Sequence, residues 1–220
     1  SDPLATALNA ELAIAGPELQ LLLIAAMADC HNPESLPAIR GQVASPDPEV
    51  RKAALTVLGK IGGPEDAAVL LTVLADTKNS DAAAVAMSSL NRMPGPDIDA
   101  QILKALSSAT DTAAQSQLIR LLGNRQAAGA TGELLHQASG ADVKVSLAAL
   151  HALISLASPG DLPALIELVK TSQDTTVRDA AEGVVYRACA KAGDPALGGE
   201  LVLAELKQAT RPADKNSWVR

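Results

Sequence analysis

Apolar residues recur at helical spacing along most of the chain. Each such stretch is about a dozen residues long and ends at glycine, proline or a short polar segment. Two neighbouring stretches show the pattern at Val50, Ala53, Ala54, Val57, Leu58 and Ile61, and then at Ala67, Leu70, Leu71 and Leu74. Spacings of three and four residues place these side chains on one face of a helix. Strand-like alternation bounded by turns is absent, so the pattern predicts an all-α protein.

The helical stretches come in pairs that repeat. Residues 47–81 align without a gap over residues 142–176, so that Leu58 corresponds to Leu153. The remaining copies fit the same frame, and the positions equivalent to Leu58 are Met27, Leu90, Leu122, Leu153 and Val185. Self-similarity at a period of about 32 residues is typical of arrays whose units bury their apolar faces against their neighbours.

Start and stop signals place the elements. We expect six helix pairs, whose first helices begin near Pro3, Pro33, Pro64, Pro96, Ala128 and Pro159, because proline is tolerated in a first helical turn. Second helices are expected to be capped by Asp47, Asp81, Asp111, Asp142 and Asp174. Gly62 and Gly63 end one helix and Gly193 another. A thirteenth helix over 194–210 would close a domain of residues 1–210, followed by a tail over 211–220 in which Trp218 folds back.

Composition narrows the class of protein. There is no Phe, one Tyr and one Trp, so the core must consist of Leu, Ile, Val and Ala, and small side chains suit closely stacked helices. The net charge of −7 argues against nucleic-acid binding, which needs basic residues at phosphates. No apolar run is long enough to span a membrane, and no signal peptide is visible. We therefore expect a soluble protein, with the cytoplasm favoured.

The repeat resembles a known family. The resemblance rests on a set of residues within 47–70: Asp47, Val50, Arg51, Ala53, Ala54, Leu58, Gly59, Ile61 and Leu70. It recurs later in the chain at Asp174, Val177, Arg178, Ala180 and Ala181. This pattern resembles the HEAT repeats of many bacterial proteins, including phycobilin lyase subunits. The resemblance implies an α-solenoid, a right-handed superhelix whose second helices line the concave face. Because fold does not fix function, it does not identify a partner.

Candidate catalytic chemistry is sparse. The three histidines, His31, His136 and His151, lack metal-ligand spacing, and neither a phosphate-binding loop nor a nucleophile–base pair stands out. The sequence thus predicts no metal, no cofactor and no enzyme activity. Cys30 and Cys189 are five repeats apart, too far for a disulfide in a stacked array, and buried thiols are the simplest interpretation.

Charge is unevenly distributed between the two sets of helices. First helices are mainly acidic, whereas second helices carry an excess of Lys and Arg. Some of these bases complement helix dipoles, and Arg51 and Arg178 are expected to pair with Asp47 and Asp174 or across repeats. Two rows, through Thr56 and through Lys60, should face away from the core. The candidate partner-binding residues on them and beside them are Lys60, Arg92, Arg120, His151, Tyr186 and Arg187.

These observations favour a non-enzymatic scaffold that binds a protein segment on the concave face, with an acidic segment as the candidate. Tyr186 is the only aromatic residue within the repeats, and tyrosine is common at binding hot spots. Two alternatives remain open. The chain could be a subunit of an enzyme such as a phycobilin lyase, or a structural module of a larger protein.

Overall fold

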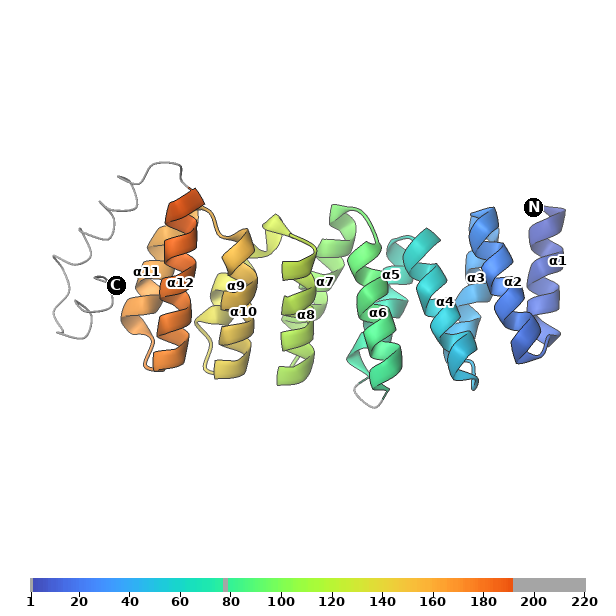
Figure 1. The fold of residues 1–220 in the computed structure, drawn as a ribbon, viewed down its shortest axis with the longest axis horizontal. Helices are drawn as coiled ribbons and strands as arrows, with labels where there is room; N and C mark the ends of the chain where they lie inside the picture. Colours follow the sequence, from blue (N-terminus) through green and yellow to red (C-terminus); the bar gives the residue numbers. More distant parts are fainter. Residues whose placement is uncertain (1, 77–78, 192–220) are drawn as a thin grey trace. The chain divides into compact units, whose positions relative to one another are not determined.

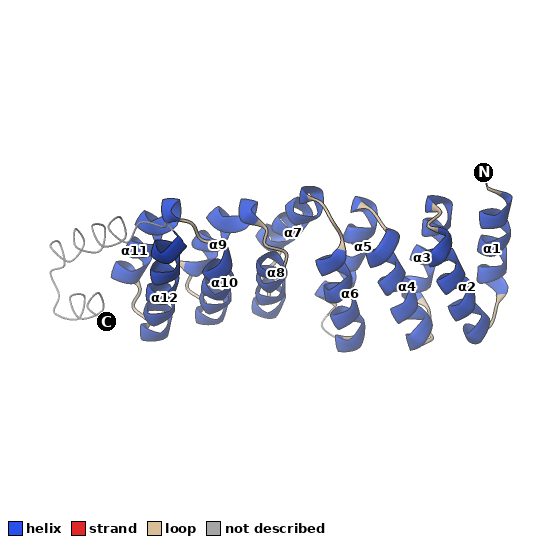
Figure 2. Cartoon of the chain, turned by 45° about the horizontal axis from the view of Figure 1, so that its top comes forward, coloured by secondary structure: helices blue, strands red, loops and turns tan. Residues whose placement is uncertain are grey.

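The computed structural model describes residues 2–76 and 79–191, and within these residues every regular element is helical (Figures 1 and 2). The first seven α-helices are α1 (Pro3–Ile14), α2 (Pro17–Cys30), α3 (Leu36–Gly41), α4 (Pro48–Ile61), α5 (Pro64–Ala75), α6 (Ser80–Arg92) and α7 (Pro96–Ser108). The other five are α8 (Thr112–Asn124), α9 (Thr131–Ala138), α10 (Val143–Leu156), α11 (Leu162–Thr171) and α12 (Thr175–Lys191). Short 3₁₀ turns precede or follow three of the first helices, at Pro33–Ser35, Gln42–Ala44, Ala128–Ala130 and Pro159–Asp161.

The predicted helix starts agree with these bounds. Each of the six first helices begins at its predicted residue, either as an α-helix or through a 3₁₀ turn. Asp47, Asp111 and Asp142 cap second helices by accepting backbone N–H groups, whereas Asn79 rather than Asp81 caps α6. Gly62 ends α4. The predicted thirteenth helix, Gly193, the tail over 211–220 and Trp218 lie outside the described residues.

The chain divides into two compact units, residues 1–108 and 109–220. The division falls between α7 and α8, inside the fourth predicted helix pair. In unit 1, the second helices pack in chain order, α2 against α4 and α4 against α6, while α1, α3, α5 and α7 supply the other layer. In unit 2, α8 packs against α10 and α10 against α12, with α9 and α11 as the other layer (Figure 1).

One repeated position forms the centre of each core. Met27, Leu58, Leu90, Leu122, Leu153 and Val185 are all buried, which confirms the predicted register of the repeats. Glycines that directly follow two of these core residues allow neighbouring second helices to approach closely. A Cβ added at Gly59 of α4 would lie 2.4 Å from Cβ of Ser89 on α6, and one added at Gly123 of α8 would lie 2.9 Å from Cβ of Ala152 on α10.

These two contacts occur at equivalent positions of the repeat, one in each unit. In each unit, one pair of second helices therefore packs through a glycine that directly follows the central core residue. Such a position tolerates little added volume, because a closely packed interior leaves no room for another carbon atom.

Candidate protein-interaction surface

As predicted, two rows of side chains on the second helices face away from the core. Every residue in both rows is exposed. The first row consists of Ala25, Thr56, Ser88, Arg120, His151 and Gly183, and the second of Asp29, Lys60, Arg92, Asn124, Ser155 and Arg187. The helical spacing that buries the Leu58 position thus leaves these two positions to solvent in every repeat.

In unit 1 the candidate cations are engaged within the protein. The Lys60 Nζ lies 3.4 Å from Oδ1 of Asp29, which occupies the same position of the preceding repeat. The Arg92 guanidinium turns back along α6 and donates to the backbone oxygen of Ser88 at 3.3 Å and to its hydroxyl at 3.4 Å. Both side chains are exposed, so these contacts are weak. They nevertheless engage the Lys60 ammonium group and the Arg92 guanidinium group within the protein.

In unit 2 the equivalent groups are free to bind. Arg120 on α8, His151 on α10 and Arg187 on α12 are exposed and make no hydrogen bond or ion pair with another residue of the described chain. Tyr186, next to Arg187, is 75% exposed. Because α8, α10 and α12 pack in sequence, these four residues lie along one face of unit 2, which carries positive charge and an aromatic ring.

Sequence analysis missed one member of this face. Ile154 on α10 is 38% exposed, and it occupies the position of the repeat that Tyr186 occupies on α12. The alignment alone could not show this, because the same position holds the buried Gly59 on α4 and the buried Gly123 on α8. We call Arg120, His151, Ile154, Tyr186 and Arg187 the α8–α12 surface.

Two other arginines of the second helices have a structural role, although not the predicted one. Arg51 Nη1 donates to the backbone oxygen of Ser45 at 2.6 Å, and Arg178 Nη2 donates to that of Ser172 at 3.0 Å. The prediction of ion pairs with Asp47 and Asp174 is therefore wrong. Those carboxylates accept backbone N–H groups at the helix starts instead, and the carbonyl six residues back is the better-placed acceptor.

Two aspartates at helix starts in unit 2, Asp142 and Asp174, have lowered pKa values. The Thr112 hydroxyl donates to Oδ2 of Asp142 at 2.6 Å, and the N–H of Val145 donates to Oδ1, so the pKa of Asp142 is lowered. The pKa of Asp174 is lowered by the Thr176 hydroxyl and by the N–H of Val177. Hydrogen bonds to the charged form explain both shifts, so these carboxylates stabilise the fold and are not poised as acids or bases.

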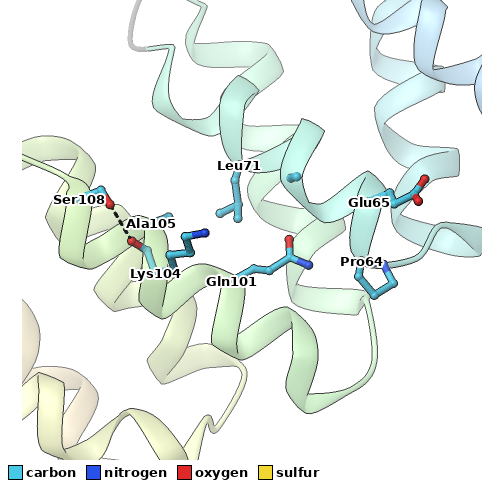
Figure 3. Close-up of a pocket in the computed structure, with 8 residues that line it drawn as sticks. Pro64, Glu65, Leu71, Gln101, Lys104, Ala105 and Ser108 are labelled. Atoms are coloured by element: carbon cyan, nitrogen blue, oxygen red, sulfur yellow. Dashed lines mark hydrogen bonds between the residues drawn. The ribbon is translucent and has the colours of Figure 1, made fainter.

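A groove of about 550 Å³ lies between α5 and α7 in the other layer of unit 1 (Figure 3). It is lined by Pro64, Glu65, Ala68, Leu71, Gln101, Lys104, Ala105 and Ser108. Its one hydroxyl, that of Ser108, donates to the backbone oxygen of Lys104 at 3.1 Å. No base faces this serine among the lining residues, so the groove does not form a nucleophile–base pair.

The cysteines differ from the prediction of buried thiols. Both are free, but Cys30 is exposed at the end of α2 and Cys189 is half-buried. Cys30 is therefore the more accessible of the two, while burial raises the pKa of the Cys189 thiol. The described residues contain no cluster of three or more His, Cys, Asp or Glu side chains that could hold a metal ion. They also contain no helix long and apolar enough to cross a membrane.

The fold defines an all-α helical-repeat protein, and the comparison with known families makes this assignment more specific. The sequence matches the family of HEAT repeats over residues 6–91 and 100–185. The chain therefore belongs to the HEAT repeat family, as the sequence pattern indicated.

Two solved structures are similar to this chain. One is an engineered protein, with 20% sequence identity and a TM-score of 0.45 over 85% of this chain and 97% of that one. The other is the complex of CpcE and CpcF of phycocyanin lyase from Nostoc sp. PCC7120, with 16% identity and a TM-score of 0.46 over 97% of this chain and 91% of that one. No curated protein matches the sequence. At such low similarity, neither structure bears on what this chain binds.

Proposed function

We propose that the chain is a non-enzymatic scaffold that binds an acidic protein segment on the α8–α12 surface. The observation that supports this most is the state of the charges in unit 2. Arg120 and Arg187 are exposed and have no partner in the described part of the chain, and Arg187 is next to Tyr186, which is 75% exposed. An exposed tyrosine next to an arginine that has no partner among the described residues is a surface that gains contacts when a partner covers it.

The chemistry of the surface fits a short segment of mixed character. Guanidinium groups bind carboxylates through paired hydrogen bonds, while Tyr186 and Ile154 offer an apolar contact area. The whole chain carries a net charge of −7, so a local cationic strip contrasts with its surroundings and would steer an acidic segment toward this face. His151 adds a donor between the two arginines.

The proposal ranks the predicted residues. Arg120, His151, Tyr186 and Arg187 carry the binding, with Ile154 added to them. Lys60 and Arg92 belong to unit 1 and contribute less, since Lys60 is paired with Asp29 and Arg92 with its own helix. A change at these two residues should therefore affect partner binding less than a change in unit 2.

A selection experiment tests the proposal without a known partner. The immobilised chain is exposed to a random peptide library, and peptides rich in Asp and Glu with an apolar residue should be enriched. The double variant Arg120→Glu, Arg187→Glu should lose this enrichment while its circular dichroism and melting temperature stay unchanged. The matched control Lys144→Glu, Lys170→Glu makes the same change of charge elsewhere in unit 2 and should enrich the same peptides.

Two results would overturn the proposal. One is a selection that returns no acidic peptides from the folded chain. The other is an acidic set that the Arg120, Arg187 variant binds as well as the unaltered chain does.

A further inference from the structure

A second apolar surface lies on α2, at the opposite end of the sequence from Tyr186. Four residues of this helix, Leu19, Leu22, Ala26 and Cys30, are all exposed. Leu22 is 69% exposed and Leu19 42%. Their spacing of three and four residues places them in one stripe, which we call the α2 face.

The equivalent positions on other second helices are covered by neighbouring residues. The equivalent residues are buried or half-buried at all four positions on α4, α6, α10 and α12. On α4, for example, they are Val50, Ala53, Val57 and Ile61. Only on α2 is the whole stripe open to solvent. Cys30 follows the same pattern. It is exposed, whereas its counterpart Met93, directly after α6, is buried.

Contacts within the units identify the kind of element that covers such a stripe. The counterparts of Ala26 are Ser89 on α6 and Ala152 on α10, and each packs against a glycine of the preceding second helix, Gly59 or Gly123. The natural occupant of the α2 face is therefore another helix, with a small residue at the point where the two helices cross.

Charge specifies the occupant further. Residues 2–39 contain five acids, Asp2, Glu11, Glu18, Asp29 and Glu34, and no Lys or Arg. Glu11 and Glu18 are exposed, and Glu18 directly precedes Leu19 of the α2 face. A second copy of this end would bring acids against acids, whereas a helix with Lys or Arg beside its apolar stripe would complement them.

We infer that the α2 face docks an amphipathic helix of a partner protein, one with a small residue at the crossing point and basic flanks. This surface is distinct from the α8–α12 surface, and its occupant has the opposite charge. The contact would extend the stacking of second helices by one member, using the same positions that pack α4 to α6 and α8 to α10.

The chain itself supplies a probe for this site. The helix that packs against Ala152 is α8, and residues 111–126 form a peptide with a net positive charge and a glycine, Gly123, at the crossing position. A helix-stabilised synthetic form of this peptide should bind the intact protein, as measured by fluorescence anisotropy. Leu22→Glu should weaken binding at least about tenfold, because it places a charge in the middle of the stripe.

Two controls separate this site from the other one and from a loss of folding. Ile154→Glu makes the same apolar-to-acidic change on the α8–α12 surface and should leave binding of the peptide unchanged. Conversely, Leu22→Glu should not alter the acidic peptides selected by the protein. A peptide with Gly123→Leu should bind poorly, since the bulkier side chain prevents close approach.

Three results would overturn the inference. The first is no binding of the peptide to the folded protein, and the second is equal binding to the Leu22→Glu variant. The third is a dimer in sedimentation velocity that Leu22→Glu dissociates, which would make a second copy the occupant. The expected result is a monomer over the concentrations at which the peptide binds.

Discussion

The two units present equivalent rows of exposed residues but use their charges differently. In unit 1, Lys60 pairs with Asp29 and Arg92 bonds to its own helix. In unit 2, Arg120 and Arg187 have no such partner among the described residues. The second helices of both units carry Lys and Arg residues, so the presence of cations alone does not locate a binding surface. Whether each cation already has a partner is more informative.

The first-helix layers show a similar contrast. Asp66 of unit 1 is almost fully buried; its Oδ1 lies 2.5 Å from Nε of Arg40, and its Oδ2 accepts the N–H of Gly63. Its equivalent in unit 2, Asp161, is half-buried and accepts only from the Ser158 N–H and hydroxyl. Unit 1 commits a charged pair to its structure, whereas unit 2 keeps only the local helix cap.

The largest effects should come from the central core position, where the units are alike. Leu58→Ala and Leu153→Ala each remove a fully buried side chain and should each cost about 2–5 kcal/mol of stability. Because repeats couple mainly to their neighbours, hydrogen exchange should quicken in the unit that carries the substitution. Equal loosening of both units by either variant would show that they do not behave as separate units.

The next effect should separate the units. Asp66→Ala removes the buried one of the two acidic partners of Arg40, leaving the exposed Glu65, and also removes a helix cap, so it should cost about 2–3 kcal/mol in urea unfolding. Asp161→Ala removes the cap alone and should cost about 1 kcal/mol. The double variant Arg40→Ala, Asp66→Ala tests the pair itself, and a loss equal to the sum of the single losses would mean that the two residues are uncoupled.

A smaller contrast is expected at the helix crossings. In a helix interior, alanine is favoured over glycine by up to about 1 kcal/mol, but an added Cβ at Gly59 would overlap Ser89, including its backbone Cα at 2.6 Å. Gly59→Ala should therefore destabilise unit 1 by about 1–2 kcal/mol.

Two other glycines in second helices provide comparisons for the effect of Gly59→Ala. Gly123→Ala, with its nearest contact at 2.9 Å, should be milder, and Gly183→Ala, which meets nothing within 4 Å, should stabilise the protein slightly. A stabilising Gly59→Ala would contradict the close approach of α4 and α6.

The smallest effect concerns the pKa of an aspartate in unit 2. The pKa of Asp142 is lowered in the folded protein, chiefly by the Thr112 hydroxyl. A depressed carboxyl pKa contributes stability above the unfolded-state pKa of about 4, and this contribution is lost as the pH falls through the folded-state value. Thr112→Val should move the pKa of Asp142 upward, toward its ordinary value, in a carbon-13 NMR titration. The pKa of Asp174, whose hydrogen bonds come from its own turn, should stay where it is.

The architecture could be predicted from the sequence because one period controls it. The spacing that buries Leu58 and its equivalents also exposes the Thr56 and Lys60 rows, so core and surface followed from a single alignment. Capping by Asp47 and Asp142 followed from local chemistry in the same way.

Other features depend on neighbours that a repeat pattern does not specify. Arg51 was expected to bond to Asp47, but a backbone carbonyl competes for its guanidinium. Cys30 was expected to be buried, yet it is exposed because no helix of the described chain covers α2 on that side. The division between α7 and α8 has no marker in the sequence, since the spacing of the repeats continues through it.

The central claim is that unpaired cations of unit 2 bind acidic segments, and one affinity measurement tests it most directly. The best acidic peptide from the selection is titrated into the unaltered chain, into Arg120→Glu, Arg187→Glu, and into the unit 1 counterpart Lys60→Glu, Arg92→Glu. The unit 2 variant should bind at least about tenfold more weakly, a loss of about 1.4 kcal/mol, while the unit 1 variant changes the affinity by much less. Equal losses in the two variants, or a larger loss in unit 1, would contradict the account.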